Sequence, residues 1–291
     1  MKFKNVLLLY KRSAYRIYFL DDASSLKKKK SPFIEEEMHR FEQAHDAHYD
    51  TLKQVSKFLL TNGIRFSESY RGRSINYAHY DLIITVGGDG TFLEAARNSK
   101  NQVILGINSA PGYSVGNFCI ANKNNFEKAL AKVINDDYKI GLLQRLKISL
   151  GNSKEEIHAL NDVLICHANP AYLCRYYLRI GQKKEEQRSS GVWISTPSGS
   201  TGAIYSAGGK KLNLFDTKFQ YKPRELYKSG SKIYNLCGAI LGKNQKIDVT
   251  SLMRKGMIYV DGAHQQFHFE YGTEATVSLS AHPIKTIRFK S

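Results

Sequence analysis

The sequence has few cysteines and lacks two motifs that would define its class at once. Four cysteines are scattered through 291 residues, and none forms a Cys-x-x-Cys pair. This pattern excludes the usual structural zinc sites, and a chain of this length needs no disulfides to fold. The Gly-x-x-x-x-Gly-Lys-Ser/Thr sequence is also absent, which excludes the P-loop enzymes.

Long apolar runs are missing as well. No window approaches the roughly 20 apolar residues of a membrane-spanning helix. The first apolar stretch, Val6–Tyr10, follows Lys2 and Lys4 but is too short for the core of a signal peptide. We therefore expect a cytoplasmic protein with reduced cysteines and no membrane partner.

Acidic residues are in the minority, and the net charge is +17. Such a surplus favours anionic partners: nucleotides, nucleic acids or membrane surfaces. The run Lys27–Lys30 is expected to be a solvated loop. A nucleic-acid-binding surface would need basic residues interleaved with aromatic ones. Only Arg175–Arg179 shows that pattern locally. A β-strand with polar faces also explains it and is the interpretation that we prefer, so we expect no nucleic-acid partner.

The first part of the chain alternates strands and helices. A long amphipathic helix is predicted from Phe33 to Leu60, with Asn62-Gly63 as its stop. It carries His39, His45 and His48, which we expect to be solvated rather than metal ligands, because no other Cys or His completes a shell. Such alternation is typical of a parallel sheet with a ligand crevice at the carboxyl ends of its strands. The other predicted elements here are strands at Asn5–Tyr10, Asp81–Val86 and Gln102–Ile107, and helices at Thr91–Asn98 and Asn124–Val133.

The second part is mostly strands, several of which alternate apolar and polar residues. We predict an α/β N-terminal domain with a Rossmann-like parallel sheet, formed by residues 1–120 and 272–291, and a mostly-β C-terminal domain, residues 121–271. The predicted strands are Leu143–Leu150, Ile157–Val163, Cys174–Ile180, Gly191–Ser195, Ile258–Val260, Gln266–Phe269 and Ala275–Leu279.

The loop Gly87-Gly88-Asp89-Gly90-Thr91 joins a buried strand to a helix. Its glycines let the backbone approach a phosphate closely, and the helix offers free N–H groups and a positive dipole end. A carboxylate repels phosphate, so Asp89 needs another purpose: it accepts a proton from an attacking hydroxyl, or it holds magnesium beside the phosphates. The alternative is a simple helix cap, but three glycines around one Asp favour the functional interpretation.

Two further polar segments lie in the second part. Ser195–Gly202 alternates hydroxyl and glycine residues after an apolar strand, which suits recognition of a ribose, an amide or a phosphate; the alternative is a plain Ser/Gly linker. Asn161-Asp162 interrupts another apolar strand. An amide beside a carboxylate can bind a pair of hydroxyls or a purine edge, although a strand-end turn explains the pair equally well.

These three segments, in this order, resemble the NAD kinase family, which has the same Gly-Gly-Asp-Gly-Thr loop, an Asn-Asp or Asn-Glu pair and a Ser-Thr-Pro-x-Gly-Ser-Thr loop. The resemblance extends to Val260-Asp261-Gly262 and so covers most of the chain. It implies an α/β domain, a β-rich domain, and a C-terminal strand that returns to the first domain. It also implies a homo-oligomer, a dimer or a tetramer, with NAD bound between the domains and near a neighbouring subunit.

The resemblance further implies the reaction and its residues. Phosphate from ATP or polyphosphate, with Mg²⁺ or another divalent cation, would be transferred to the adenosine ribose 2′-hydroxyl of NAD to give NADP. Asp89 would be the general base. The implied binding residues are Gly88, Gly90, Thr91 and Phe92 at the loop, Asn161 and Asp162 at the ribose hydroxyls, and Ser198, Thr201 and Ser206 in the NAD pocket.

Some positions depart from the bacterial members of the family. Gly116-Asn117-Phe118 has one aromatic fewer than their Gly-Phe-Tyr, and Ser189-Ser190-Gly191 replaces an Asp-Gly. The tyrosine usually found directly after Thr201-x is absent, although Tyr205 lies close. Ser189-Ser190-Gly191 and Arg175-Tyr176-Tyr177 are more similar to the mitochondrial-type branch. These differences concern the contacts with NAD rather than the chemistry of Asp89.

Lipid kinases of the diacylglycerol and sphingosine type share the glycine loop and are the main alternative. They usually follow its threonine with a stretch ending Asn-Glu, whereas Phe92-Leu93-Glu94 follows here. They also need an exposed apolar surface for an acyl chain, and the sequence shows no such stretch. The sequence leaves open the choice between ATP and polyphosphate, and that between NAD and NADH.

Overall fold

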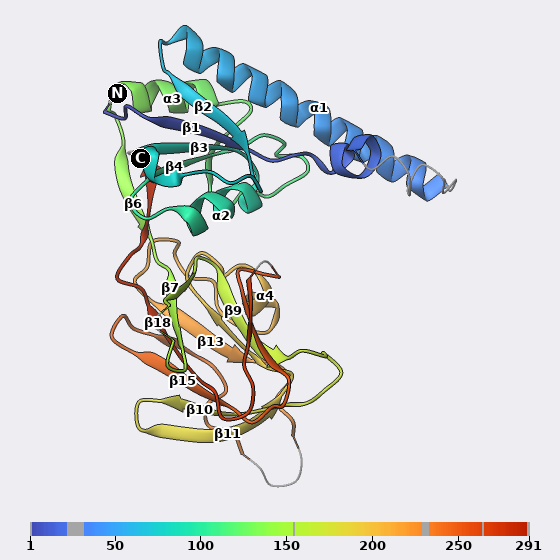
Figure 1. Ribbon diagram of the computed structural model, residues 1–291, viewed down its shortest axis with the longest axis vertical. Coiled ribbons are helices and arrows are strands. Elements are labelled where there is room, and N and C mark those ends of the chain that lie inside the picture. Colours follow the sequence, from blue (N-terminus) through green and yellow to red (C-terminus); the bar gives the residue numbers. More distant parts are fainter. Residues whose placement is uncertain (1, 22–31, 154, 229–232, 264, 290–291) are drawn as a thin grey trace. The chain divides into compact units, whose positions relative to one another are not determined.

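The computed structural model describes residues 2–21, 32–153, 155–228, 233–263 and 265–289. They form two compact units: Met1–Gly141 with Ile284–Ser291, and Leu142–Pro283. The first is α/β and the second is mostly antiparallel β (Figure 1), as the sequence predicted. The Lys27–Lys30 run lies outside the described residues.

The first unit is built on a seven-stranded sheet with the order β2-β1-β3-β4-β19-β6, in which β5 also pairs with β4. Strand β1 pairs in parallel with β2 and β3, and β4 pairs in parallel with β3, β5 and β19. The C-terminal strand thus returns to the first unit, as expected. The strands are β1 (Val6–Tyr10), β2 (Phe66–Tyr70), β3 (Leu82–Gly87), β4 (Val103–Asn108), β5 (Cys119–Asn122), β6 (Lys139–Leu143) and β19 (Ile284–Arg288).

Helices cover both faces of this sheet. Helices α1 (Pro32–Thr61) and α3 (Phe126–Ile134) lie on one face, and α2 (Asp89–Asn98) lies on the other (Figure 1). Leu52, Val55 and Leu59 of α1 are buried in the core on their face. Helix α1 ends where predicted: Gly63 has φ +70°, and the next amide donates to the carbonyl of Leu59. Two short helical turns, Arg16–Asp21 and Tyr77–His79, complete the unit.

The strand order places a topological switch point between β1 and β3. The chain leaves β1 toward α1 on one face and leaves β3 toward α2 on the other, so the two connections diverge. In open α/β sheets ligands bind at such a switch point, outside the carboxyl ends of the strands. The predicted glycine loop directly follows β3 and therefore lies at this edge.

The second unit consists of two six-stranded sheets, ordered β11-β10-β15-β18-β7-β8 and β14-β13-β12-β9-β16-β17. Side chains of both sheets form one buried core, which includes Tyr176, Phe219 and Phe269. Helix α4 (Ala203–Ser206) follows β12. The strands are β7 (Leu146–Leu150), β8 (Ile157–Ala159), β9 (Asp162–His167), β10 (Cys174–Ile180), β11 (Lys183–Ser189), β12 (Val192–Ser195), β13 (Phe219–Pro223), β14 (Ala239–Leu241), β15 (Lys246–Ser251), β16 (Gly256–Val260), β17 (Gln265–His268) and β18 (Glu274–Leu279).

The division between the units differs from the expected boundaries at residues 120 and 272. Residues 121–141 belong to the first unit, because α3 packs on its sheet and β6 extends it. Residues 272–283 belong to the second, because β18 pairs with β15 and β7. The strand predicted at Leu143–Leu150 is confirmed over Leu146–Leu150, which is β7, but its start was wrong. Leu143 ends β6, and β6 and β7 lie in different sheets because the chain passes from one unit to the other between them.

Candidate active site

Asp89 lies at the first position of α2, where the glycine loop turns out of β3. The N-cap residue is Gly88, whose carbonyl accepts the amide of Thr91 at 3.0 Å. The first amide groups of a helix have no intrahelical acceptors and face outward with the positive end of the dipole. Oδ1 of Asp89 accepts a hydrogen bond of 2.9 Å from the backbone amide of Phe118. The carboxylate is therefore held at one oxygen beside amide groups that are able to bind an anion.

The side chains of Phe92 and Phe118 support this loop from the inside. Their rings stack with centroids 5.0 Å apart and planes 10° apart. Phe92 is fully buried and Phe118 nearly so. The ring of Phe92, which the sequence placed among the binding residues, thus packs in the interior. The sequence singled out Phe118 only as a remaining aromatic residue. Its amide could not be predicted, because a backbone donor leaves no trace in the side-chain pattern.

Crowding explains why the loop needs its glycines. A Cβ atom on Gly87 would lie 2.3 Å from Oγ1 of Thr91, and one on Gly88 would lie 3.2 Å from Oγ of Ser114. Thr91 is buried, and its hydroxyl has no hydrogen-bond partner within the protein. A buried hydroxyl without a partner is uncommon. We expect this hydroxyl to acquire a partner when the loop binds a ligand.

His48 ties the long helix α1 to two loops at the same edge of the sheet. Its Nε2 lies 2.8 Å from the carbonyl oxygen of Lys11, after β1, and its Nδ1 lies 2.8 Å from Oγ of Ser109, after β4. A carbonyl oxygen only accepts, so Nε2 carries the proton and Nδ1 accepts from the serine hydroxyl. The expectation of a solvated histidine is wrong at this position, since His48 is fully buried. Periodicity alone could not show that loops cover this face of α1.

The other two histidines of α1 have different surroundings. Nδ1 of His45 lies 2.6 Å from Oγ of Ser13, whereas His39 is exposed and contacts Gln43. Among the described residues, no cluster of three His, Cys, Asp or Glu side chains is arranged to hold a metal ion.

In the second unit the Asn161-Asp162 pair lies at a break between β8 and β9, not inside one strand as predicted. The carboxylate of Asp261 stabilises the break by accepting hydrogen bonds from three backbone amides, those of Leu160 at 2.9 Å, Asn161 at 2.7 Å and Asp162 at 3.3 Å. Asp261 has a left-handed backbone, φ 50°. It is the residue that shapes this site, and sequence reasoning missed it because its partners are about a hundred positions away.

Burial makes Asp162 chemically unusual. Desolvation, followed by repulsion from Asp261, raises the pKa of Asp162 to about 7. A desolvated carboxyl group with a pKa near neutrality is a candidate for a ligand contact. Asn161 is a second candidate for a ligand contact, because its side-chain oxygen is buried without a hydrogen-bond partner.

The Ser195–Gly202 loop packs against this pair. The amide of Thr196 donates to the carbonyl of Asn161 at 3.0 Å, and a Cβ on Gly199 would lie only 2.4 Å from that carbonyl. A Cβ on Gly202 would lie 4.0 Å from Oδ2 of Asp162. The structure therefore brings together the two segments that the sequence singled out separately. Of the predicted residues here, Ser198 is buried with an unpartnered hydroxyl, and Thr201 and Ser206 are exposed.

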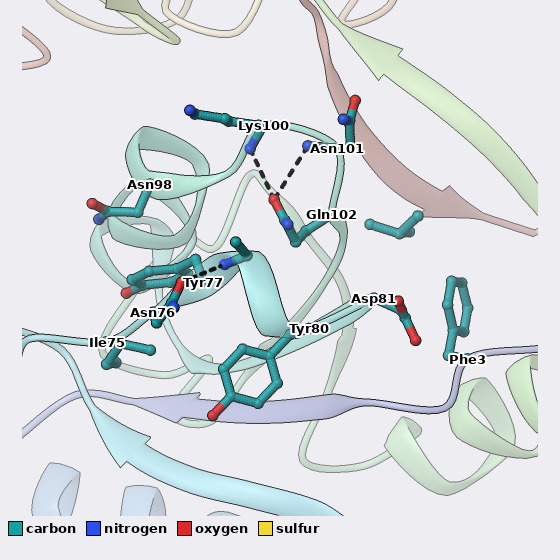
Figure 2. A pocket seen from close by; sticks show the side chains of 12 residues that line it. Phe3, Ile75, Asn76, Tyr77, Tyr80, Asp81, Asn98, Lys100, Asn101 and Gln102 are labelled. Carbon is teal, nitrogen blue, oxygen red and sulfur yellow. Dashed lines mark hydrogen bonds between the residues drawn. The ribbon is translucent and has the colours of Figure 1, made fainter.

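A large cavity of the first unit lies away from the glycine loop. It has a volume of about 730 Å³ and lies beside the amino-terminal ends of β3 and β4 (Figure 2). Asp81, Gln102 and Tyr77 line it. This is the edge of the sheet opposite to the glycine loop, so its size does not make it the reaction site.

Comparison with known proteins agrees with these features. Residues 6–138 match the family model described as the ATP-NAD kinase N-terminal domain. The chain is 29% identical to a probable NADH kinase of rice, Oryza sativa subsp. japonica, over 82% of its own length and 81% of the relative's. It is 32% identical to the NADH kinase of Arabidopsis thaliana, over 69% and 70% of the two chains. The crystal structure of an NAD kinase from Archaeoglobus fulgidus in complex with ATP superposes with a TM-score of 0.71 at 21% identity, covering 98% and 94% of the chains.

These matches define the protein as a kinase, an enzyme that phosphorylates an alcohol group. The chain belongs to the NAD kinase family. None of the helices within the described ranges is long and apolar enough to cross a membrane.

Proposed function

We propose that this protein phosphorylates the adenosine ribose 2′-hydroxyl of NAD or NADH, with ATP or polyphosphate as the donor, and that Asp89 is the general base. The observation that carries the proposal is the position of the Asp89 carboxylate. It lies at the N-terminus of α2, at the carboxyl edge of a parallel sheet, with Oδ1 held by Phe118. A base must be fixed in orientation and still have an oxygen available to the hydroxyl that it deprotonates.

The glycine loop is suited to the donor. Amide groups of Gly88, Asp89 and Gly90 at the helix start would bind phosphate oxygens, and the Thr91 hydroxyl is a further unpartnered donor nearby. Phosphoryl transfer depends mainly on positioning and on stabilising charge, so a rigid loop of this kind supplies much of what the reaction needs.

The residues also fit Mg²⁺ that arrives with the donor. Magnesium is usually bound by one or two carboxylates together with substrate phosphates and water, not by an all-protein cage. Because Asp89 is assigned as the base, the ion would be held by the donor phosphates and water beside this carboxylate. Within the described chain no three-residue ligand cluster accompanies it. The ion would neutralise charge on the phosphates, while the protein's own residues orient the reactants.

The second unit would recognise the dinucleotide. Asn161 and Asp162 have side-chain oxygens able to accept hydrogen bonds from ribose hydroxyls, and Asn161 Oδ1 has no partner within the protein. Ser198 carries an unpartnered hydroxyl. Thr201 is exposed on the same Ser195–Gly202 loop, and Ser206 is exposed at the end of α4. A site with such groups binds a ligand that carries the matching hydroxyls much more tightly than an analogue without them, because the analogue leaves the buried polar groups unpaired.

The test is an assay with the purified 291-residue chain. NAD and NADH are each incubated with Mg²⁺ and with ATP, other nucleoside triphosphates or inorganic polyphosphate, and the phosphorylated dinucleotide is identified by mass spectrometry. Diacylglycerol and sphingosine serve as acceptors in parallel. We expect NADP or NADPH, with formation abolished by EDTA and restored by Mg²⁺. Phosphorylation of a lipid without any dinucleotide product would overturn the proposal.

Two predictions from the sequence accompany this proposal. A homo-oligomer, either a dimer or a tetramer, is expected, and light scattering of the purified protein measures its mass. A cytoplasmic location also stays a prediction, which fractionation of cells of the source organism would check.

A further inference from the structure

Two basic residues border the glycine loop from the neighbouring strands. Lys11 directly follows β1 and Arg71 directly follows β2. The strand register aligns the carboxyl ends of β1, β2 and β3, and the amide of Arg71 donates to the carbonyl of Tyr10 at 2.8 Å. Both basic residues therefore lie at the same edge of the sheet as the start of the glycine loop.

Their side chains approach two of the loop glycines. A Cβ on Gly87 would lie 3.6 Å from Cγ of Lys11, so the lysine stem runs alongside the start of the loop. A Cβ on Gly90 would lie 2.7 Å from Nη1 of Arg71, so the guanidinium reaches the first turn of α2. The side chains of Lys11 and Arg71 therefore lie beside the glycine loop, whose amide groups flank Asp89.

Among the residues that the structure describes, these two side chains form none of the ion pairs or ring contacts that other basic residues nearby form. Arg12 and Arg16 pair with Asp21, and the Arg73 guanidinium lies 4.7 Å from the centre of the Tyr70 ring. Within the described chain neither Lys11 nor Arg71 forms an ion pair. Burial lowers the pKa of Lys11, and the charge of Arg71 lowers it further. Lys11 is partly buried and Arg71 is exposed beside it. The repulsion between these like charges, together with the desolvation of the Lys11 ammonium, costs stability unless an anion joins them.

We infer that Lys11 and Arg71 form a cationic clamp for the polyphosphate chain of the phosphoryl donor. This inference rests on the proposed function, because it assigns residues to the donor part of the same site. The planar guanidinium of Arg71 can bind two phosphate oxygens at once, and the ammonium of Lys11 acts as a point charge on the partly buried side. A linear phosphate chain is the chemistry that ATP and inorganic polyphosphate share.

The clamp and a purely structural role predict opposite effects on stability. If Lys11 and Arg71 repel each other in the absence of an anion, removing either charge should not destabilise the ligand-free protein. If they only pack against the loop, removing them should lower its melting temperature. Lys11→Met keeps most of the aliphatic stem, and Arg71→Met does the same for its residue. Arg73→Met removes a nearby charge that stacks on Tyr70 and is the matched control.

The experiment measures binding of magnesium tripolyphosphate by calorimetry, melting temperature with and without that probe, and KM for ATP and for NAD or NADH. We expect Lys11→Met and Arg71→Met to weaken tripolyphosphate binding and raise the KM for ATP by about tenfold or more. The KM for the dinucleotide and the melting temperature without ligand should stay as in the wild type, and Arg73→Met should bind the probe normally.

The outcomes separate the two proposals. If the wild-type protein forms NADP or NADPH while both variants bind tripolyphosphate as tightly as wild type, the clamp is wrong and the proposed function stands. Lower melting temperatures with equal rises in both KM values would also overturn the clamp, in favour of a structural role. If the wild-type protein phosphorylates no dinucleotide, the proposed function fails, and the clamp assignment fails with it.

Discussion

The backbone amide of Phe118 donates a hydrogen bond of 2.9 Å to Oδ1 of Asp89, although the two residues are 29 positions apart. The loop after β4 thereby orients a carboxylate at the end of β3. The stacked rings of Phe118 and Phe92 hold that loop in place. The orientation of the proposed base therefore depends on packing in the interior.

Truncating the Phe118 ring should lower turnover, although this ring packs in the interior on Phe92. We expect Phe118→Ala to destabilise the protein by about 3 kcal/mol, because it removes a buried ring. Its kcat should fall at least about tenfold, since a displaced base loses more in the transition state than in binding, while the KM for NAD changes little. Phe118→Leu retains bulk and amide, and should keep most activity. A fully active Phe118→Ala enzyme would show that the loop does not need the ring.

His48 should make stability depend on pH below neutrality. Burial, and next the charge of Lys11, lower its pKa to about 4. Since the unfolded chain binds this proton near pH 6.5 and the folded one only near pH 4, the stability contributed by neutral His48 is present above pH 6.5 and is lost as the pH falls toward 4. The loss amounts to about 3 kcal/mol at most.

Urea unfolding from pH 4 to pH 7.5 measures this effect. His48→Gln can donate and accept in similar directions but does not titrate, so its free energy of unfolding should fall less than that of wild type toward acid pH. His39→Gln, at an exposed position, is the control and should follow wild type. Parallel curves for wild type and His48→Gln would contradict a buried neutral histidine.

Asp162 should have the opposite effect on stability. Its pKa is raised to about 7, mainly by burial and then by Asp261. Between about pH 4 and pH 7 the folded protein retains a proton that the unfolded chain has released, so stability falls as the pH rises through this window. Asp162→Asn stays neutral. Its advantage in unfolding free energy over wild type should therefore grow between pH 4 and pH 7, to about 4 kcal/mol at most.

The comparison with wild type isolates this residue, because the His48 contribution is common to both proteins and cancels. Glu270→Gln, at an exposed position of the same unit, should show no such trend. An advantage of Asp162→Asn that stays constant with pH would mean that Asp162 is ionised throughout.

Much of the first unit could be predicted from local sequence. Strands β1, β3 and β4 are continuous apolar runs, and the glycine loop with α2 follows β3 directly. Strands β2 (Phe66–Tyr70) and β11 (Lys183–Ser189) were missed because they lie at sheet edges and are largely polar. Their pairing with β1 and β10 stabilises them, which is a tertiary effect that local patterns do not encode.

Of the site, the sequence predicted only those residues that are adjacent to one another along the chain. The Gly87–Thr91 loop and the Asn161-Asp162 pair could be recognised because their chemistry is contiguous. The groups that position them come from distant segments: Phe118 for Asp89, and Asp261 for the turn at Asn161. A backbone donor and a single Asp at a strand end carry no pattern of their own, so only the fold identifies them.

The most direct test of the account is turnover by Asp89→Asn alongside its affinity for NAD. Asparagine keeps the size and can still accept the Phe118 amide, but it cannot take a proton from the ribose hydroxyl. With Asp50→Asn, exposed on α1, as the control, we predict that kcat falls by about 10²–10⁴-fold while the dissociation constant for NAD, measured by calorimetry, stays as in wild type. Near-normal kcat in Asp89→Asn would contradict the assignment of Asp89 as the general base.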